Sequence, residues 1–334
     1  MVHVTVNIDV LIDLTLKYLG FITSFFGWRL SLAKCIQVQV GYHLLRKFML
    51  YINDVLNRRV YRYFNKGDQW GSLEEILETQ ERVLCVLTGG SHGLGQQLYQ
   101  KLVSKYCQRY KNFELLIVDK DIISQDNCAF NVHFLQHDFI KRIGDKIDYF
   151  SSQKYTYKIV INNCGTRIEF HDFLQSWQNS SKFLDLLHIN VISACDLLYI
   201  LKPDYIITVS SILSMISPKN GFLYSSTKNM VSNMHESYVQ MENKRGILVL
   251  PGQLKGTDLF KKFEPMFKGN FKQVVSPLVS IDSLSDEIVQ AMGKLENKVI
   301  VKPYYGFFIK ILLFTPFWLQ KVLRMLSSVA AVED

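Results

Sequence analysis

The sequence predicts an α/β fold, a doubly wound parallel sheet in a single domain, with apolar segments at both ends that we expect to associate with a membrane. Short apolar runs alternate with stretches of helical length from residue 82 onward, and a glycine-rich turn follows the first run. The composition is globular and leans toward apolar, with 48% hydrophobic and 20% charged residues. Alternation of this kind is typical of parallel sheets that carry helices on both faces.

Seven short apolar runs are the predicted strands. They are Arg82–Leu87, Leu115–Val118, Val132–Leu135, Ile159–Ile161, Ile206–Val209, Ile247–Leu250 and Val299–Val301. The predicted helices between them are Leu94–Cys107, Phe183–Leu201, Leu223–Met241 and Leu284–Leu295. Because a doubly wound sheet binds ligands at the carboxyl ends of its strands, residues directly after these runs are the candidates for a site.

Three regions follow from this pattern: an amphipathic N-terminal region (1–75), the sheet domain (80–302) and a hydrophobic tail (303–334). Charges such as Asp9 and Arg29 keep every uncharged run in the first region short of the ~20 residues that a spanning helix needs. Tyr304–Leu319 is rich in aromatics around Lys310, which suits an interfacial anchor. Both segments could instead be amphipathic helices that cover an apolar patch or a dimer partner.

The net charge of +8 fits an anionic membrane surface better than nucleic acid, because no nucleic-acid motif appears and several basic residues flank the apolar N-terminal region. The six cysteines are scattered, and none forms the close pair that a metal site requires. We therefore expect free thiols, no metal site and no nucleic-acid partner.

The glycine-rich turn is the first motif that carries chemistry. Thr88–Gly95 reads TGGSHGLG and lies between a predicted strand and a predicted helix. Glycine allows a sharp turn and close approach of backbone to phosphate, and the following helix N-terminus offers free N–H groups. A tight structural turn is the alternative, but its place between strand and helix favours dinucleotide binding.

Asp119 ends the second predicted strand, 24 residues after Gly95. A carboxylate there can accept hydrogen bonds from the adenosine ribose and would repel a 2′-phosphate, which favours NAD over NADP. Lys120 beside it could weaken that repulsion, and the aspartate could also simply begin a solvated loop.

Tyr224 and Lys228 are four residues apart in YSSTK and would share one face of the predicted helix. A phenol has a pKa near 10, and a nearby ammonium can stabilise the phenolate so that the phenol acts as an acid or base. Ser211 follows the fifth strand, 13 residues before Tyr224, where its hydroxyl could hold a carbonyl oxygen. Taken singly, these residues could equally be ordinary helix and turn positions.

Together the motifs resemble the short-chain dehydrogenase/reductase family, in the right order over roughly Arg82 to Val301, which implies a Rossmann-like fold. The turn matches TGxxxGxG, Asn162–Gly165 matches NNAG with Cys164 in place of alanine, and Ser211, Tyr224 and Lys228 match the family's serine and YxxxK pair. The apolar N-terminal region, the PGQL sequence at Pro251–Leu254 and the tail look most like the membrane-bound branch that includes hydroxysteroid and retinol dehydrogenases.

The resemblance implies four catalytic residues: Tyr224 as general acid/base, Ser211 orienting the substrate oxygen, Lys228 binding the nicotinamide ribose, and Asn190 holding a water. It also implies a set of residues that contact the cofactor, NAD or NADP. These are Gly89, Ser91, His92, Gly93, Leu94, Gly95, Asp119, Asp138, Asn163, Gly165, Tyr224, Lys228, Pro251, Gly252 and Thr257. Thr257 lies one residue later than the family's usual threonine.

The sequence thus predicts an NAD(P)-dependent oxidoreductase that interconverts a hydroxyl and a carbonyl on a hydrophobic, lipid-like substrate. Asp258–Pro277 is the expected substrate lid. We expect a membrane-associated protein at the endoplasmic reticulum or lipid droplet, with the domain facing the cytosol, and a homodimer is plausible. The alternatives are a biosynthetic lipid ketone reductase that uses NADPH, and a membrane-tethered nucleotide-binding protein without catalysis.

Overall fold

The computed structural model describes most of the chain from residue 71 onward and a few positions before it. The described ranges are 71–121, 130–167, 180–217, 221–241, 244–257, 278–303 and 315–320, with the single positions Gly41, Leu44, Leu45, Phe48, Tyr51, Ile52, Gly306 and Ile309. The chain forms two compact units, His3–Gln69 and a larger one made of Trp70–Asp334 with Met1–Val2. The sheet and the helices that pack on it belong to the larger unit.

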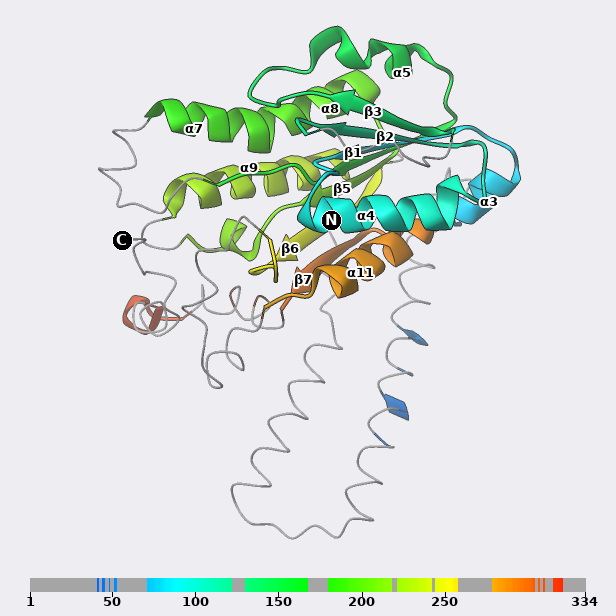
Figure 1. Ribbon diagram of the computed structural model, residues 1–334. Coiled ribbons are helices and arrows are strands. Elements are labelled where there is room, and N and C mark those ends of the chain that lie inside the picture. Colours follow the sequence, from blue (N-terminus) through cyan, green and yellow to red (C-terminus); the bar gives the residue numbers. More distant parts are fainter. Residues whose placement is uncertain are drawn as a thin grey trace. The chain divides into compact units, whose positions relative to one another are not determined.

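A parallel sheet forms the centre of this unit (Figure 1). The described residues contribute seven strands in the order β3-β2-β1-β4-β5-β6-β7. Their bounds are β1 Val83–Thr88, β2 Phe113–Asp119, β3 Val132–Gln136, β4 Tyr157–Asn162, β5 Tyr205–Val209, β6 Arg245–Pro251 and β7 Lys298–Lys302. The strand order reverses between β1 and β4, which is the point where doubly wound folds bind their ligands. The predicted α/β class and parallel sheet are therefore confirmed.

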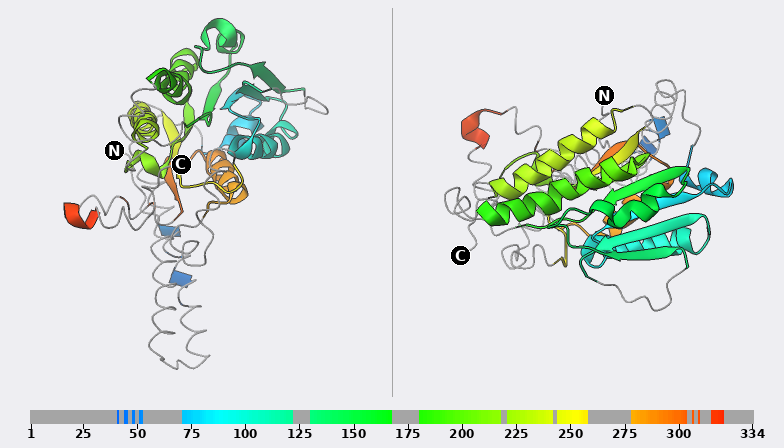
Figure 2. Two further views of the ribbon diagram at one scale, coloured as in Figure 1. Left: turned by 60° about the vertical axis from the view of Figure 1, so that its left-hand side comes forward. Right: turned by 90° about the horizontal axis from the view of Figure 1, so that it is seen from above.

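Helices cover both faces of the sheet (Figure 2). They are α3 Leu73–Glu78, α4 Gly93–Leu102, η1 Val103–Cys107, η2 Gly144–Ile147, α5 Asp148–Ser152, α7 Ser180–Leu187, η3 His188–Ile192, α8 Ser193–Leu201, η4 Ile212–Ser214, α9 Phe222–Tyr238 and α11 Ile281–Gly293. Successive strand residues point to opposite faces. Cys85 and the strand residues on its face of the sheet pack with α3, α4 and α11. Leu84 and the strand residues on the opposite face pack with α8.

All four predicted helices are present with boundaries close to those expected, and the short helices α3 and α5 are additions. In α3, Leu73, Ile76 and Leu77 are fully buried in the main core, although the N-terminal region was expected to extend to residue 75. Within the described part, one helix, Ser181–Leu201, is long and apolar enough to cross a membrane, but half of its apolar window is buried. That burial is what packing on the sheet requires, so the helix is weak evidence for a span.

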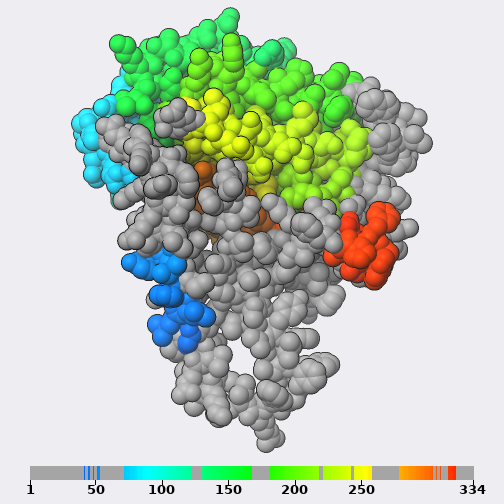
Figure 3. All heavy atoms as spheres, turned by 180° about the vertical axis from the view of Figure 1, so that it is seen from behind, coloured from blue at the N-terminus to red at the C-terminus, as the bar shows by residue number. Residues whose placement is uncertain are grey.

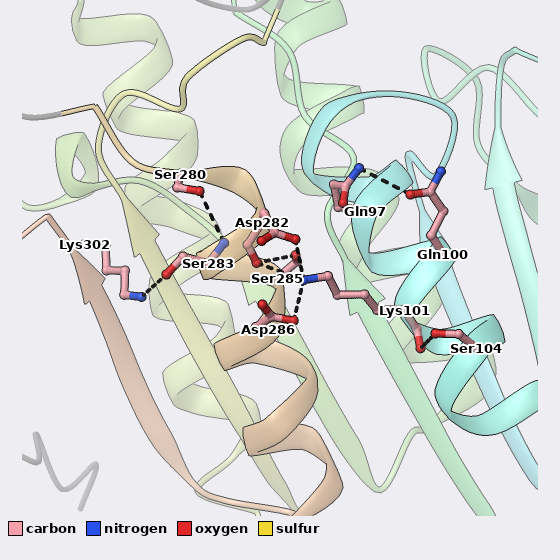
Figure 4. A network of polar contacts seen from close by, with 10 residues as sticks. All are labelled: Gln97, Gln100, Lys101, Ser104, Ser280, Asp282, Ser283, Ser285, Asp286 and Lys302. Carbon is pink, nitrogen blue, oxygen red and sulfur yellow. Dashed lines mark hydrogen bonds and ion pairs between the residues drawn. The ribbon is translucent and has the colours of Figure 1, made fainter.

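A polar clamp joins α4 to α11 (Figure 4). The Lys101 ammonium donates to the Asp282 carboxylate at 2.8 Å, to the Asp282 carbonyl at 3.0 Å and to the Asp286 carboxylate. Asp282 lies in the first turn of α11, where its negative charge also interacts favourably with the helix dipole. The clamp holds α11 against the helix that begins at the glycine-rich turn.

The C-terminal segment is partly packed on the domain. Gly306 is buried, and a β-carbon there would lie 2.9 Å from the Ile212 side chain. Ile309 is 7% exposed and packs with Ile212, Leu248 and Leu250. Farther along, Phe317 and Trp318 are exposed in a short helical turn. The described part of the tail therefore covers an apolar patch of the domain and also presents two aromatic side chains to solvent, while its attachment to a membrane stays a prediction.

Acid pH is expected to destabilise the protein through His235, which is buried between α9 and the sheet. Its Nδ1 lies 2.9 Å from Thr208 Oγ1, and burial lowers its pKa to about 3. Between that value and the unfolded pKa of ~6.5, the unfolded chain binds a proton that the folded protein excludes. Above pH ~6.5 His235 therefore does not lower the free energy of unfolding. Below that pH, its contribution makes the free energy of unfolding fall by ~1.4 kcal/mol per pH unit.

Urea unfolding of the wild type and His235→Gln at a series of pH values measures this effect. The glutamine can still bond Thr208 but does not titrate, so the difference between the two proteins should shrink as the pH falls from 7 to 5. Parallel pH profiles would show that His235 takes up its proton without unfolding.

Candidate active site

The glycine-rich turn between β1 and α4 packs tightly against the start of the β4–α7 connection. Gly89 and Gly93 have φ values of +70° and +56°, which favour glycine. A β-carbon on Gly95 would lie 1.8 Å from the Gly89 carbonyl oxygen, and one on Gly89 would lie 2.9 Å from the Cys164 Cα. Every one of these glycines is therefore required by a backbone conformation or a close approach.

Thr88 and Asn163 hold the turn in place. Thr88 Oγ1 accepts hydrogen bonds from the backbone N–H groups of Asn163 (3.0 Å) and Cys164 (2.9 Å). The Asn163 side chain in return donates to the carbonyl oxygens of Thr88 (3.1 Å) and Gly89 (2.9 Å). These four bonds join the ends of β1 and β4 at the reversal of the strand order, so the side chain of Asn163, which was predicted to contact the cofactor, supports the turn in this structure.

Asp119 lies where the sequence predicted it, at the carboxyl end of β2 and beside the turn. Its carboxylate accepts hydrogen bonds from the N–H groups of Ser91 (2.9 Å) and Asp121 (3.2 Å). The Ser91 hydroxyl donates to the Asp121 carbonyl, and the exposed His92 ring lies 3.7 Å from the Asp121 carboxylate. Two carboxylates therefore lie together at the position expected for the adenosine ribose.

The remaining predicted cofactor residues lie along the same edge. Asp138 follows β3, and the neighbouring His137 N–H donates to the Asp119 carbonyl at 2.8 Å. The Thr257 methyl group would be 3.3 Å from a β-carbon on Gly93, so the later spacing of this threonine still brings it to the turn. Leu94 is buried in the main core, so only its backbone can face a ligand. Pro251 ends β6, and Gly252 follows it directly.

Tyr224, Ser211 and Lys228 meet at the carboxyl ends of β5 and β6. All three are buried, and the Ser211 hydroxyl hydrogen-bonds the Tyr224 phenol and approaches the Pro251 carbonyl at 3.5 Å. Lys228 Nζ lies 6.0 Å from the centre of the Tyr224 ring and donates to the Val209 carbonyl at 3.0 Å. A β-carbon on Gly165 would be 2.9 Å from Lys228 Nζ, so this ammonium also reaches the turn after β4.

The electrostatics of Tyr224 differ from the expectation. Burial raises the pKa of the phenol to about 12, against the opposing effects of the Ser211 hydrogen bond and the Arg167 charge. Burial also lowers the pKa of Lys228 to about 8. Lys228 does not bring the pKa of Tyr224 toward neutrality in the free protein, because desolvation of the phenolate outweighs the neighbouring charges. The phenol is therefore protonated at neutral pH.

Asn190 lies in the π-helical turn η3 and its side chain is used inside the protein. Its Oδ1 accepts from the Thr166 N–H at 2.8 Å, and its Nδ2 donates to the Thr166 carbonyl at 2.9 Å and to Thr227 Oγ1 at 3.0 Å. The side chain thus fixes the loop after Gly165 against the helix that carries Lys228. Both hydrogens of its amide are used, so a water held by Asn190 would have to donate to Oδ1 or to the backbone carbonyl.

Known proteins are similar to this chain in sequence and in fold. No family model matches the chain. A curated relative, "Uncharacterized oxidoreductase TDA5" of Saccharomyces cerevisiae, is 25% identical over 340 residues, which cover 94% of each chain. Similar solved structures include a short-chain dehydrogenase from Burkholderia cenocepacia in complex with NADP, with 17% identity, a TM-score of 0.56, and coverage of 74% of this chain and 97% of that one.

A second solved structure is 3-oxoacyl-[acyl-carrier protein] reductase from Brucella melitensis in complex with NAD. It has 16% identity, a TM-score of 0.56, and coverage of 68% of this chain and 98% of that one. This chain has the short-chain dehydrogenase fold. The expected similarity to the hydroxysteroid and retinol branch of these dehydrogenases stays a prediction.

The residues of this short-chain dehydrogenase fold fit a dinucleotide. The glycines leave a cradle that any β-carbon would fill, and the first turn of α4 is open because the His92 side chain makes no capping hydrogen bond. Free N–H groups at a helix N-terminus suit a pyrophosphate. The turn after β4 packs on Gly89 and reaches the Lys228 ammonium, so a nicotinamide cofactor bound there would exchange hydride with a substrate carbon held next to the Tyr224 phenol.

Arg167 is a residue of the site that was not predicted from the sequence. It follows Thr166, whose N–H and C=O are both bonded by Asn190, and its charge lowers the pKa of Tyr224. An arginine keeps its charge at any working pH, whereas the buried Lys228 has a pKa of about 8. The only signal in the sequence was a basic residue two positions after the Asn-Asn-Cys-Gly motif.

Proposed function

We propose that this protein is an NAD-dependent oxidoreductase that interconverts a hydroxyl and a carbonyl on a lipid-like substrate, with Tyr224 as general acid/base. The observation that carries the proposal is the meeting of the Tyr224 phenol, the Ser211 hydroxyl and the Lys228 ammonium beside a glycine cradle. The dehydrogenase fold and the yeast oxidoreductase relative support the same class of reaction.

In this proposal Ser211, Tyr224, Lys228 and Arg167 divide the work of the reaction. Ser211, fixed by the Leu213 N–H at 3.1 Å, holds the substrate oxygen close to the phenol. Tyr224 gives its proton to that oxygen during reduction, which suits a phenol that is protonated at neutral pH. Lys228 binds the nicotinamide ribose, and Lys228 and Arg167 favour the phenolate once the proton has left.

A preference for NAD over NADP follows from the charges around the ribose position. Asp119 and Asp121 bring two carboxylates beside Ser91, and Lys120, between them in the sequence, is exposed. A 2′-phosphate would be repelled there, whereas ribose hydroxyls can donate to Asp119.

A lipid-like substrate and attachment to a membrane surface remain part of the proposal. Phe317 and Trp318 are exposed near the C-terminal end, and aromatics of this kind suit the headgroup region. In the N-terminal unit, Leu44, Leu45, Phe48 and Tyr51 are helical and exposed, and Phe48 follows Leu44 by four residues and Leu45 by three. A membrane at the endoplasmic reticulum or lipid droplet, with the domain in the cytosol, is the proposed location. The expected lid, Asp258–Pro277, lies outside the described residues.

A homodimer is proposed through the outer surface of α7, α8 and α9. These helices form the green to yellow-green surface in Figure 3 and carry exposed Leu184, Tyr199 and Met230. Exposed apolar groups on neighbouring helices favour burial against a second copy.

The test is an assay of the protein purified in detergent. Binding of NADH and NADPH is measured by fluorescence, and oxidation of each is followed by nicotinamide absorbance with a panel of long-chain, steroid and retinoid carbonyls. We expect NADH to bind at least about tenfold more tightly, a difference of ~1.4 kcal/mol, and to be consumed with at least one lipid carbonyl.

Two other outcomes would each favour an alternative. Tighter binding and faster oxidation of NADPH would favour a biosynthetic ketone reductase. Binding of NADH without turnover in either direction, across the whole panel and the matching alcohols, would favour a nucleotide-binding protein without catalysis.

A further inference from the structure

Gln253 follows the carboxyl end of β6, close in the chain to the proposed reacting centre, and has no task in the proton transfer proposed for Tyr224. It is separated by Gly252 from Pro251, whose carbonyl contacts the Ser211 hydroxyl. Its own carbonyl accepts from the Val279 N–H at 2.8 Å, and the next residue, Leu254, pairs with Val279 as an isolated bridge. The backbone at Gln253 is therefore fixed, and so is the position from which its side chain starts.

The side-chain amide of Gln253 is buried without a hydrogen-bond partner. Its Nε2 is shielded from solvent, and no described residue accepts a hydrogen bond from it. Buried donors are almost always paired, because an unpaired one loses its water and gains nothing. At the edge of a sheet where ligands bind, an unpaired donor is best explained by a partner that arrives with the ligand.

We infer that Gln253 donates a hydrogen bond to an oxygen atom that the substrate carries close to its reacting carbonyl. The substrate class is then an oxygenated ketone or the matching alcohol, such as a hydroxy or acyloxy ketone with a long chain, in place of a plain hydrocarbon ketone. This inference rests on the proposed function, because Ser211 and Tyr224 mark the position of the reacting carbonyl.

Gln253→Met tests the inference, because methionine has a similar size and shape but no donor. In the free protein, removal of an unpaired buried donor should raise the melting temperature. In turnover with NADH, we compare methyl undecyl ketone with hydroxymethyl undecyl ketone. The wild type should favour the hydroxylated ketone in kcat/KM by about tenfold, and Gln253→Met should lose that preference mainly through KM.

Gln97→Met is the matched control, since the Gln97 amide already donates to Gln100 on the exposed side of α4. It should leave both the melting temperature and the ketone preference close to those of the wild type. A melting temperature of Gln253→Met at or below the wild-type value would overturn the inference, because the amide would then have a partner in the free protein.

Equal kcat/KM for the two ketones in the wild type would overturn the inference and leave the proposed oxidoreductase intact. If neither ketone is turned over, the melting temperature with NADH and each ketone decides instead. A larger rise with the hydroxylated ketone in the wild type than in Gln253→Met would support the inference. Equal rises in the two proteins would reject it.

Discussion

Tyr224→Phe is expected to reduce turnover by about 10² to 10⁴-fold while binding NADH as tightly as the wild type. The change removes one buried hydroxyl that is hydrogen-bonded to Ser211 and leaves the ring in place. Without that proton the substrate oxygen loses the acid that the proposal places beside it, and the Lys228 ammonium lies 6.0 Å from the centre of the Tyr224 ring. Steady-state kinetics with the best substrate of the panel, and fluorescence titration with NADH, measure the two quantities.

Tyr238→Phe controls for the loss of a phenolic hydroxyl from the same helix. Tyr238 donates to the Pro203 carbonyl at 2.7 Å, away from the site, so its removal should cost some stability and leave turnover unchanged. If Tyr224→Phe retained the turnover of Tyr238→Phe, proton transfer would have to be assigned to another group.

Gly95→Ala should prevent dinucleotide binding and destabilise the domain. The new methyl group would lie 1.8 Å from the Gly89 carbonyl oxygen and 2.6 Å from the Asn163 amide nitrogen. Both atoms belong to the network that joins β1 to β4, so the turn has to move. Overpacking of this kind costs about 1–3 kcal/mol or more, and we expect NADH to bind at least roughly 100-fold more weakly, since ~1.4 kcal/mol is tenfold in affinity.

Gly144→Ala separates this effect from the general cost of replacing a glycine. Gly144 has a φ of +49° and nothing within 4 Å of its β-carbon position, so alanine there brings backbone strain of about 1–2 kcal/mol and no collision. Melting temperatures and NADH affinities of the two variants should therefore diverge. Unchanged NADH affinity in Gly95→Ala would mean that the turn does not hold the pyrophosphate.

The sheet and its main helices could be predicted because their patterns are repeated and long. Each strand is an apolar run of about the right length, and the helix around Tyr224 shows the expected spacing. The helix α3 was not predicted, because it has only six residues and directly follows an apolar region that resembled a membrane segment. A short helix gives too few turns for a periodic signal.

The sequence predicts those residues of the candidate site that form motifs with a known spacing. It does not predict the residues that come together only through the fold. The glycines, Asp119, Ser211, Tyr224 and Lys228 lie at one edge of the sheet, as the motifs implied. The direction of the Tyr224 pKa shift was wrong, since burial cannot be read from a pair of residues four apart. Arg167 and Gln253 are single residues in loops, and only their surroundings single them out.

The packing of Gly306 and Ile309 decides where this chain can be shortened. These residues close the apolar surface formed by Leu248, Leu250 and Ile212, and Ile212 follows directly after Ser211. A protein cut after β7 to remove the hydrophobic tail would uncover that surface and loosen the turn that positions the serine. A shortened version intended to stay in solution should therefore keep Gly306 and Ile309 as part of the domain.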